Sequence, residues 1–395
     1  MTSVRARNPV RRQRAGIRRG QGVGGYLFTA PAVILLLVFL VIPILMALWV
    51  SFSDWGGNGS PFSSGVHFVG FRNYASITSG GGLSEQDFGT SLRNNLWYVI
   101  FVVPTQTVLA LLLAMLVNNR LLKGRGFFRT AFYFPSVTSS VAITVLWYFL
   151  FNPTGAVNQL LGAIGLHGPN WPADADGLVH NLLALVGVHN GPAFLVDGGF
   201  LGVSWWDWLA GPSVGMMIII TMVVFTTAGT FMLLFIAALQ NLSQEVEEAA
   251  MVDGATTWQR FRLVTLPQLR TTIFTVLTLG LIGTWQVFDQ VLVGSQGNPQ
   301  KTTLTPAYLS YIAGFQEQNW GQAAAIAFIL FAIIVAFTLL QRVVLRERGV
   351  SARRMRRAGF DRGGDGGYRP AHEGLLAAAV VAGGTSGRPG QGGTL

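Results

Sequence analysis

Long apolar runs alternate with polar loops along this sequence. At 1.5 Å per residue, a helix of about 20 residues crosses the roughly 30 Å of hydrocarbon in a bilayer. The third run is short, and we expect its helix to begin earlier, near Ala131. The pattern predicts an all-α polytopic membrane protein with six transmembrane helices, at 26–52, 96–117, 136–151, 214–239, 272–293 and 323–344.

The loops between the apolar runs differ in charge. Lys and Arg gather in the loops at 119–130 and 241–270, whereas the long loop at 152–212 has four Asp and no Lys or Arg. Basic loops stay on the cytoplasmic side of a membrane, so we predict that both termini are cytoplasmic. An apolar stretch at 178–188 is too short to cross, and it predicts an outer helix packed on the bundle.

Composition supports a membrane domain flanked by polar ends. Hydrophobic residues make up 51% of the chain and charged residues 11%, against about 25% charged in an average soluble domain. Seven arginines fall within residues 1–19, so much of the net charge of +10 indicates topology and not nucleic-acid binding. We predict a basic cytoplasmic segment at 1–24, a six-helix transmembrane domain at 25–345, and a disordered cytoplasmic tail at 346–395 that is basic and then Gly-rich.

The residue patterns of enzymes are missing. The chain has no Cys, and its five His show no H-E-x-x-H spacing, so we expect no metal site. No nucleophile elbow or pair of carboxylates indicates a catalytic residue. Neither of the two lysines, Lys123 and Lys301, follows the glycine of a G-x-x-x-x-G-K-[ST] loop, so any ATP energy must come from another subunit.

The loop at 241–268 carries the signals of a helix, a sharp turn and a second helix. Ser243 is a candidate N-cap, and glutamates follow it where negative charge suits the helix dipole. Gly254 can adopt the left-handed conformation that ends a helix. Thr256 and Gln259 form the capping-box pattern that starts the second helix.

Two roles fit this helix pair, whose second helix we expect Pro267 to end. An amphipathic helix on lipid headgroups would suit Arg260 and Arg262. The first helix argues against that role, because its glutamates would face the anionic cytoplasmic leaflet. Small side chains at the bend let a partner approach the backbone, which favours a docking helix for a soluble protein.

A polar cluster lies in the fifth apolar run. Asp289 is the one carboxylate inside a predicted span, and an ionisable residue in a membrane is a functional candidate. Gln286, Asp289 and Gln290 supply hydrogen-bonding groups, and Trp285 and Phe288 supply aromatic faces, a combination that suits a sugar. The alternative is that Asp289 reaches outer water and that the two aromatic residues are packing residues.

The cytoplasmic motif resembles a known family. Glu248-Ala249-Ala250, then Gly254, then Leu266-Pro267 resembles the coupling loop of binding-protein-dependent ABC transporter permeases. Segments at 68–74, 153–158 and 283–289 are similar to elements of its carbohydrate-uptake branch. The resemblance implies an ABC importer permease fold in the bacterial inner membrane. It implies ATPase contacts at Glu247, Glu248, Ala249, Ala250, Asp253, Gly254, Ala255, Leu266 and Pro267. It also implies a substrate pathway at Trp285, Gln286, Phe288, Asp289 and Gln290.

The resemblance also implies partners. These are a second permease subunit in a hetero-pair, two ATPase subunits that hold ATP and Mg²⁺, an extracytoplasmic solute-binding protein and a carbohydrate. This chain itself would bind lipid, no cofactor and no nucleic acid.

Other functions stay open at this point. An ABC permease for another solute, such as glycerol phosphate or a polyamine, would keep the same fold. A phosphorylated substrate would favour basic groups along the pathway, and the predicted spans carry none apart from Arg342 near the end of the last one. A secondary transporter driven by an ion gradient would use Asp289 and leave the cytoplasmic motif without a purpose, and a membrane-embedded enzyme lacks a catalytic group.

Overall fold

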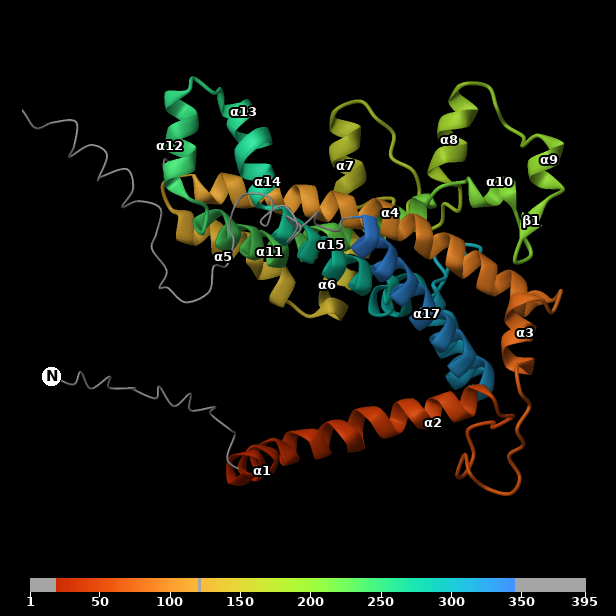
Figure 1. Cartoon of the computed structure of the whole chain (residues 1–395). Helices are drawn as coiled ribbons and strands as arrows, with labels where there is room; N and C mark the ends of the chain where they lie inside the picture. Colours follow the sequence, from red (N-terminus) through yellow and green to blue (C-terminus); the bar gives the residue numbers. More distant parts are fainter. Residues whose placement is uncertain (1–18, 120–121, 345–395) are drawn as a thin grey trace, which may run out of the picture. The chain divides into compact units, whose positions relative to one another are not determined.

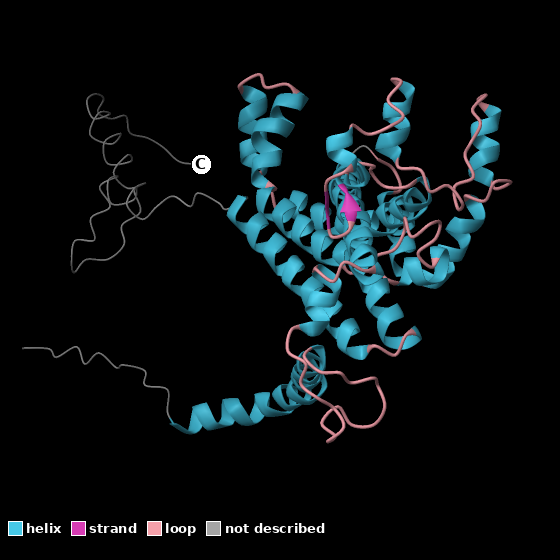
Figure 2. Ribbon diagram, turned by 90° about the vertical axis from the view of Figure 1, so that its right-hand side faces the viewer, coloured by secondary structure: helices cyan, strands magenta, loops and turns pink. Residues whose placement is uncertain are grey.

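The computed structural model describes residues 19–119 and 122–344 (Figure 1). The chain divides into two compact units, residues 1–345 and 346–395, and the description concerns the first. Most of the basic N-terminal segment and the tail predicted to be disordered lie outside the described residues. The described part is helical, apart from one pair of short strands (Figure 2).

The first predicted span is confirmed as a helix. α1 (Arg19–Leu36), η1 (Leu37–Val41) and α2 (Ile42–Ser51) follow one another without a break. Only 6% of its most apolar window is buried within the chain, and both views show it standing away from the other helices except near its end (Figures 1 and 2). There α2 packs on α17 (Trp320–Val344). α17 is itself a long apolar helix, so the last predicted span is confirmed as a helix.

Two long helices form the centre of the bundle. α4 (Leu83–Asn118) has 36 residues and begins well before the predicted span at 96–117, and α11 (Val214–Gln240) matches the predicted fourth span. They pack on each other through buried apolar side chains such as Val102, Met216 and Ile219. α4 also contacts α15 (Arg270–Trp285), so three helices converge on one core.

The predicted third span is wrong as a single straight helix. The chain forms α5 (Arg125–Val137) and α6 (Ser140–Leu150), which meet at 98°. Thr138 and Ser139 between them have extended backbones, with ψ of 152° and 127°. Pro135 lies one turn earlier and lacks a backbone N–H, which weakens the end of α5. An apolar run shows that a segment is buried, but it does not show where the backbone bends.

The predicted fifth span is wrong at its outer end. α15 stops at Trp285 instead of near residue 293, and after a turn Asp289 and Gln290 start a short helical turn that continues as η3 (Val291–Ser295). At its other end α15 meets the helix at 257–268 at 67°. Within the described residues four helices are long and apolar enough to cross a membrane, or up to six if each bent pair is one span, so six crossings stay a prediction.

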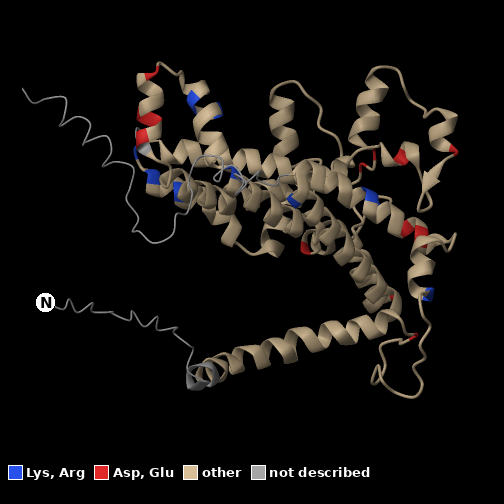
Figure 3. Ribbon diagram, in the orientation of Figure 1, with Lys and Arg blue, Asp and Glu red and all other residues tan. Residues whose placement is uncertain are grey.

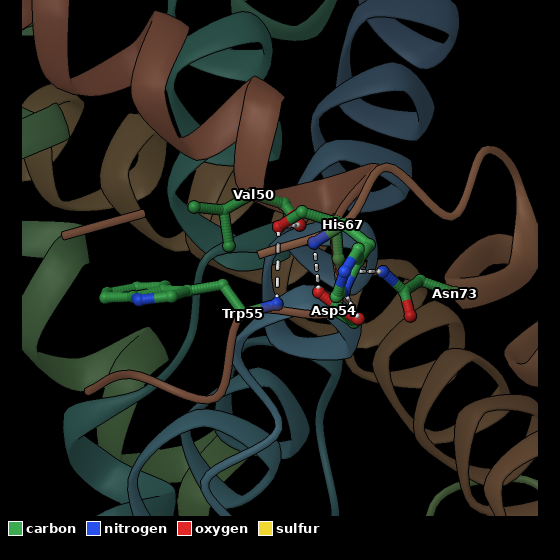
Figure 4. Close-up of polar contacts among 6 residues, drawn as sticks. Val50, Asp54, Trp55, His67 and Asn73 are labelled. Atoms are coloured by element: carbon green, nitrogen blue, oxygen red, sulfur yellow. Dashed lines mark hydrogen bonds and ion pairs between the residues drawn. The ribbon is translucent and has the colours of Figure 1, made fainter. Parts of the chain in front are cut away.

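The segment at 68–74 anchors the end of the first helix. It leads into α3 (Arg72–Thr78), where the side chain of Asn73 is buried. Its Nδ2 donates to the carbonyl oxygens of Ser51 and Ser53, at 3.0 and 2.8 Å. Figure 4 shows Asn73 beside the chain that follows Val50. The segment that resembles a family element therefore satisfies carbonyls at a helix end, which would otherwise lack partners.

The long outer loop contains four short helices and a hairpin. The helices are α7 (Ala156–Ala163), α8 (Leu178–Leu185), α9 (Ala193–Val196) and α10 (Trp205–Trp208). The strands β1 (Gly199–Phe200) and β2 (Val203–Ser204) are antiparallel, with Gly199 opposite Ser204 and Phe200 opposite Val203.

The predicted outer helix exists as α8, but its expected packing on the bundle is wrong. Leu182 and Leu185 are 56% and 84% exposed. Backbone contacts hold this helix instead, because the Leu178 N–H donates to the Pro212 carbonyl oxygen at 2.9 Å. The His180 ring of this helix also stacks on Trp206, with ring centroids 4.4 Å apart, so α8 is held by neighbouring segments of the outer loop.

The helices between and after the spans complete the described fold. α16 (Pro306–Tyr311) and η4 (Ile312–Gln316) precede α17 and pack on its first turns. Lys and Arg gather near the end of α4 and the start of α5, and acidic residues near the start of α4 and α10 (Figure 3). The orientation expected from the basic loops stays a prediction.

Candidate functional site

The segment at 241–268 forms the predicted helix pair. α12 (Gln244–Val252) is followed by Gly254 with φ of +77°, so the prediction of a left-handed glycine is confirmed. The capping box is also confirmed, because the Thr256 hydroxyl accepts from the Gln259 N–H and the Gln259 side chain accepts from the Thr256 N–H. Ser243 takes the N-cap position, but its side chain makes no capping hydrogen bond.

The second helix of the pair runs further than predicted. α13 (Thr257–Arg260), η2 (Phe261–Thr265) and α14 (Leu266–Gln268) are continuous, so Pro267 lies inside the helix and not at its end. The wider hydrogen bonding of η2 ends with the Leu266 N–H donating to the Phe261 carbonyl oxygen. Pro267 is the second residue of α14. Proline is tolerated in the first turn of a helix, where its missing N–H removes no intrahelical hydrogen bond.

The helix pair is exposed. Val252, Trp258 and Leu263 are 87%, 66% and 70% exposed, and no residue of α12 whose side chain is described is buried. Figure 1 shows α12 and α13 side by side, projecting beyond the end of α11. All nine predicted ATPase contacts are at least partly exposed. Five are exposed, namely Glu248, Ala249, Asp253, Gly254 and Pro267. Four are half-buried, namely Glu247, Ala250, Ala255 and Leu266.

A cavity of about 270 Å³, lined by both polar and apolar side chains, lies where α15 ends. α4, α11, α15 and the turn after α15 each supply part of its wall. Four of the five residues predicted for the substrate pathway line it, namely Gln286, Phe288, Asp289 and Gln290. The break in the fifth helix turns these side chains toward one space, because α15 does not continue past Trp285.

Trp285 does not line this cavity. Its side chain is 1% exposed and packs 5.3 Å from the ring of Phe337 on α17. The packing alternative therefore holds for Trp285. In a helix, the side chains of successive residues point about 100° apart. The residue next to a cavity residue can therefore point into the packed core instead of the cavity.

A second cavity of about 210 Å³ lies at the bend between α5 and α6. The Gln290 Nε2 donates to the Ser140 hydroxyl at 3.3 Å and so connects the two broken helices. Both cavities are lined by Thr227 and Gln290. The second cavity is rich in hydroxyls, from Ser136, Thr138, Ser140, Thr226, Thr227 and Thr230.

Charge is scarce around both cavities. Among the described residues that line them, Asp289 is the one charged side chain, and it is exposed at the break. The remaining polar groups are neutral hydroxyls and amides. Such a lining can exchange hydrogen bonds with a neutral polar solute and would leave most of an ion's charge without a partner.

Most of the cavity residues were not among the predicted site residues, and they include polar residues inside long apolar helices. Gln106 lies inside the apolar run of α4, and Thr227 lies inside α11. The signal was a polar side chain within an apolar span, and a search for carboxylates alone misses it.

The long apolar helices, a cavity with few charges among them and an exposed helix pair at one end are features of a membrane transport protein. The family described as the binding-protein-dependent transport system inner membrane component matches residues 106–349. The match covers more than half of the chain, so the chain belongs to this family and is a multi-pass inner-membrane transport component.

Named relatives extend along most of the chain. The lactose transport system permease protein LacF of Rhizobium radiobacter is 29% identical over 338 residues, which cover 85% of this chain and 98% of LacF. The arabinooligosaccharides transport system permease protein AraP of Bacillus subtilis is 29% identical over 318 residues, covering 80% of this chain and 86% of AraP.

Solved structures share the fold. A chain from a bacterial ABC transporter that imports the acidic polysaccharide alginate aligns with a TM-score of 0.62 at 21% identity. The alignment covers 84% of this chain and 97% of that one. A second structure of the alginate transporter, in complex with an alginate pentasaccharide-bound periplasmic protein, aligns with a TM-score of 0.61 at 20% identity. The fold is therefore that of an ABC importer permease.

Proposed function

We propose that this chain forms the translocation pathway of an ATP-driven importer for a neutral carbohydrate. The observation that carries the proposal is the pair of neighbouring cavities at the break after α15, which share Thr227 and Gln290 and whose polar groups are amides, hydroxyls and one carboxylate beside apolar side chains. The pathway residues are Gln286, Phe288, Asp289 and Gln290. The names of the relatives LacF and AraP point to the same class of substrate.

The polar groups that line the two cavities suit a sugar better than a phosphate ester or a polyamine. A phosphate ester needs cationic partners in a pathway of low dielectric, and the described lining has none. A polyamine carries several positive charges, and the single carboxylate of Asp289 could form an ion pair with only one of them. Sugar hydroxyls both donate and accept, as do the amide and hydroxyl groups in this lining.

The exposed helix pair supports coupling to a separate ATPase. Helices that are exposed on several sides and carry apolar residues such as Val252 and Trp258 are suited to lie in a groove of a partner. The chain has no phosphate-binding loop, so ATP and Mg²⁺ would be held by two ATPase subunits. Glu247 to Ala255, with Leu266 and Pro267, would form the contact.

The chain offers a direct mechanical link between the two sites. The helix that ends at Gln268 is separated from α15 by Leu269 alone, and Leu269 is 1% exposed. α15 then runs for 16 residues to the cavity. Movement of the helix pair with an ATPase would therefore pass through a buried joint to the break where the substrate residues lie.

Two further partners complete the importer. A second permease subunit, in a hetero-pair, would cover the exposed apolar helices, including α1 and α2, together with lipid. An extracytoplasmic solute-binding protein would deliver the sugar at the outer face.

Transport by the assembled complex tests this function. The chain is reconstituted in liposomes with candidate permease, ATPase and binding-protein subunits from the same organism. Uptake of lactose, maltose, trehalose and an arabinotriose is compared with that of glycerol 3-phosphate and spermidine, with ATP inside the vesicles. We expect ATP-dependent uptake of one or more sugars. Uptake of glycerol 3-phosphate or spermidine alone, or uptake driven by an ion gradient without ATP, would contradict the proposal.

A further inference from the structure

Gln106 is a buried polar residue in the middle of an apolar helix. It lies on α4 with 1% of its surface exposed, and it belongs to the wall of the cavity at the end of α15. Burial removes an amide from water, so each of its polar atoms needs a partner.

One end of the Gln106 amide has such a partner. The Thr227 hydroxyl on α11 lies 2.6 Å from Gln106 Oε1, and it lies equally close to the carbonyl oxygen of Val223. A hydroxyl has one proton and two lone pairs. Thr227 can therefore donate to the amide oxygen of Gln106 or accept from the amide nitrogen, but only one end of the amide lies beside it at a time. The side chain is thus fixed in place by a neighbouring helix.

The other end of the amide has no partner. Among the described residues none hydrogen-bonds Gln106 Nε2, which is buried. It lies against Gly280 on α15, where a Cβ would collide with it. An unpaired amide destabilises this arrangement, because folding has removed its water without replacing the hydrogen bond.

The cavity that Gln106 lines is also lined by the pathway residues. Gln286 and Asp289 line it, together with Thr284 and Gly280. Gly280 has no side chain, so α15 approaches α4 closely there and its backbone lies against the amide nitrogen.

We propose that Gln106 is a substrate-binding and specificity-determining residue, whose amide hydrogen-bonds a hydroxyl of the carbohydrate when α15 shifts at Gly280. A hydroxyl suits either orientation of the amide, because it both donates and accepts. Thr227 is the positioning residue that holds the side chain. The inference rests on the proposed function, and it adds a contact from α4 to those from the fifth span.

Gln341 provides a matched control. It lies on α17, its Nε2 donates to the Phe274 carbonyl oxygen at 3.4 Å, and its Oε1 is also buried without a partner among the described residues. It is not part of either cavity described above. Gln341→Leu therefore removes a comparable amide between helices away from the proposed pathway.

The test compares Gln106→Leu and Gln341→Leu in the complete importer in liposomes. The probes are lactose, maltose, trehalose and an arabinotriose, followed by the monodeoxy analogues of whichever sugar the wild type imports. We expect Gln106→Leu to raise the KM for uptake about tenfold and Gln341→Leu to leave it within about twofold. The wild type should discriminate against one monodeoxy analogue, and Gln106→Leu should import that analogue and the parent sugar equally well.

Gln106→Asn, made in parallel, keeps an amide but withdraws it by one methylene, so it gives the same readout if Gln106→Leu does not assemble. The inference is overturned if the Gln106 variants behave like Gln341→Leu and keep the wild-type discrimination between analogues. If the wild-type importer takes up none of the four sugars, the proposed function fails and this inference fails with it. Wild-type uptake with unaffected Gln106 variants overturns this inference alone.

Discussion

Glycines at the helix surfaces have two different roles. At Gly229 on α11, an added Cβ would collide with the carbonyl oxygen of Phe132 on α5. At Gly283 on α15, no heavy atom lies within 4 Å of the added Cβ. The first glycine permits close helix packing, and the second faces the cavity.

Alanine should therefore have opposite effects at these two positions. We expect Gly229→Ala to lower the free energy of unfolding by about 1–3 kcal/mol, because backbone of α5 cannot move aside as a side chain can. Gly283→Ala should be neutral or stabilise by up to about 1 kcal/mol through helix propensity. Thermal unfolding in detergent measures both, and equal midpoints for the two variants would contradict the packing described here.

A pH-sensitive contact lies in the outer loop after α2. The Asp54 carboxylate accepts from the His67 N–H at 2.7 Å and lies 3.2 Å from the His67 ring (Figure 4). The His67 N–H is the largest cause that holds the pKa of Asp54 below its ordinary value. Because the pKa is lowered on folding, this contact contributes stability above the unfolded pKa of about 3.9 and loses it as the pH falls through the folded value.

We expect protection of the His67 amide against hydrogen exchange to fall as the pH drops below about 4. Asp54→Asn keeps an acceptor but cannot titrate, so its protection should be weaker and independent of pH in that range. Hydrogen exchange read by mass spectrometry on the 53–68 peptide, corrected for intrinsic rates, gives both profiles. Parallel profiles for the two proteins would show that Asp54 is not the titrating group.

Residue-level features were predictable where the backbone imposes local rules. The left-handed Gly254 and the Thr256–Gln259 capping box follow from short-range chemistry, and both are present. Trp285 and Gln106 depend on which helix face meets which neighbour. The direction of a side chain across a helix interface is set by tertiary packing, which the spacing of apolar residues in one helix does not reveal.

At the scale of elements, Asn73 joins two parts of the chain that are far apart in sequence. It bonds carbonyls at the end of α2, and Gly321 at the start of α17 lies against the same side chain. We expect Asn73→Ala to lower the free energy of unfolding by about 1–3 kcal/mol, since two buried carbonyls lose their donor. Asn58→Ala, at an exposed site in the same loop, is the control for thermal unfolding in detergent. Equal stability of these two variants would argue against the anchoring role.

Helix existence was predictable from hydropathy, whereas helix breaks were not. The runs that became α11 and α17 matched their predicted spans closely. The bend after Val137 and the end of α15 at Trp285 lie within runs that are long and apolar on average, although polar residues such as Thr138 and Gln286 follow each break. A bundle can bury a broken helix when neighbouring side chains satisfy its backbone groups, and the site residues gather at those breaks.

At the scale of the whole molecule, the predicted orientation assigns each loop to one side of the membrane. Because the chain has no native Cys, single cysteines report on one position each. We expect a membrane-impermeant thiol reagent to label Ser63→Cys and Asp197→Cys on cells, and Thr257→Cys only after permeabilisation. Labelling of Thr257→Cys on intact cells would overturn the predicted orientation of the helix pair.

The central claim is that the exposed helix pair docks on an ATPase and drives the pathway. The most direct test places a single cysteine at Ala249, which is exposed on α12, and another in the surface groove of the co-expressed ATPase subunit. We predict a disulfide-linked adduct between the two subunits whose yield changes when ATP is added. If no ATPase cross-links to Ala249→Cys while lipid shields the introduced thiol from reagent, the helix pair lies on the membrane and the account of coupling is wrong.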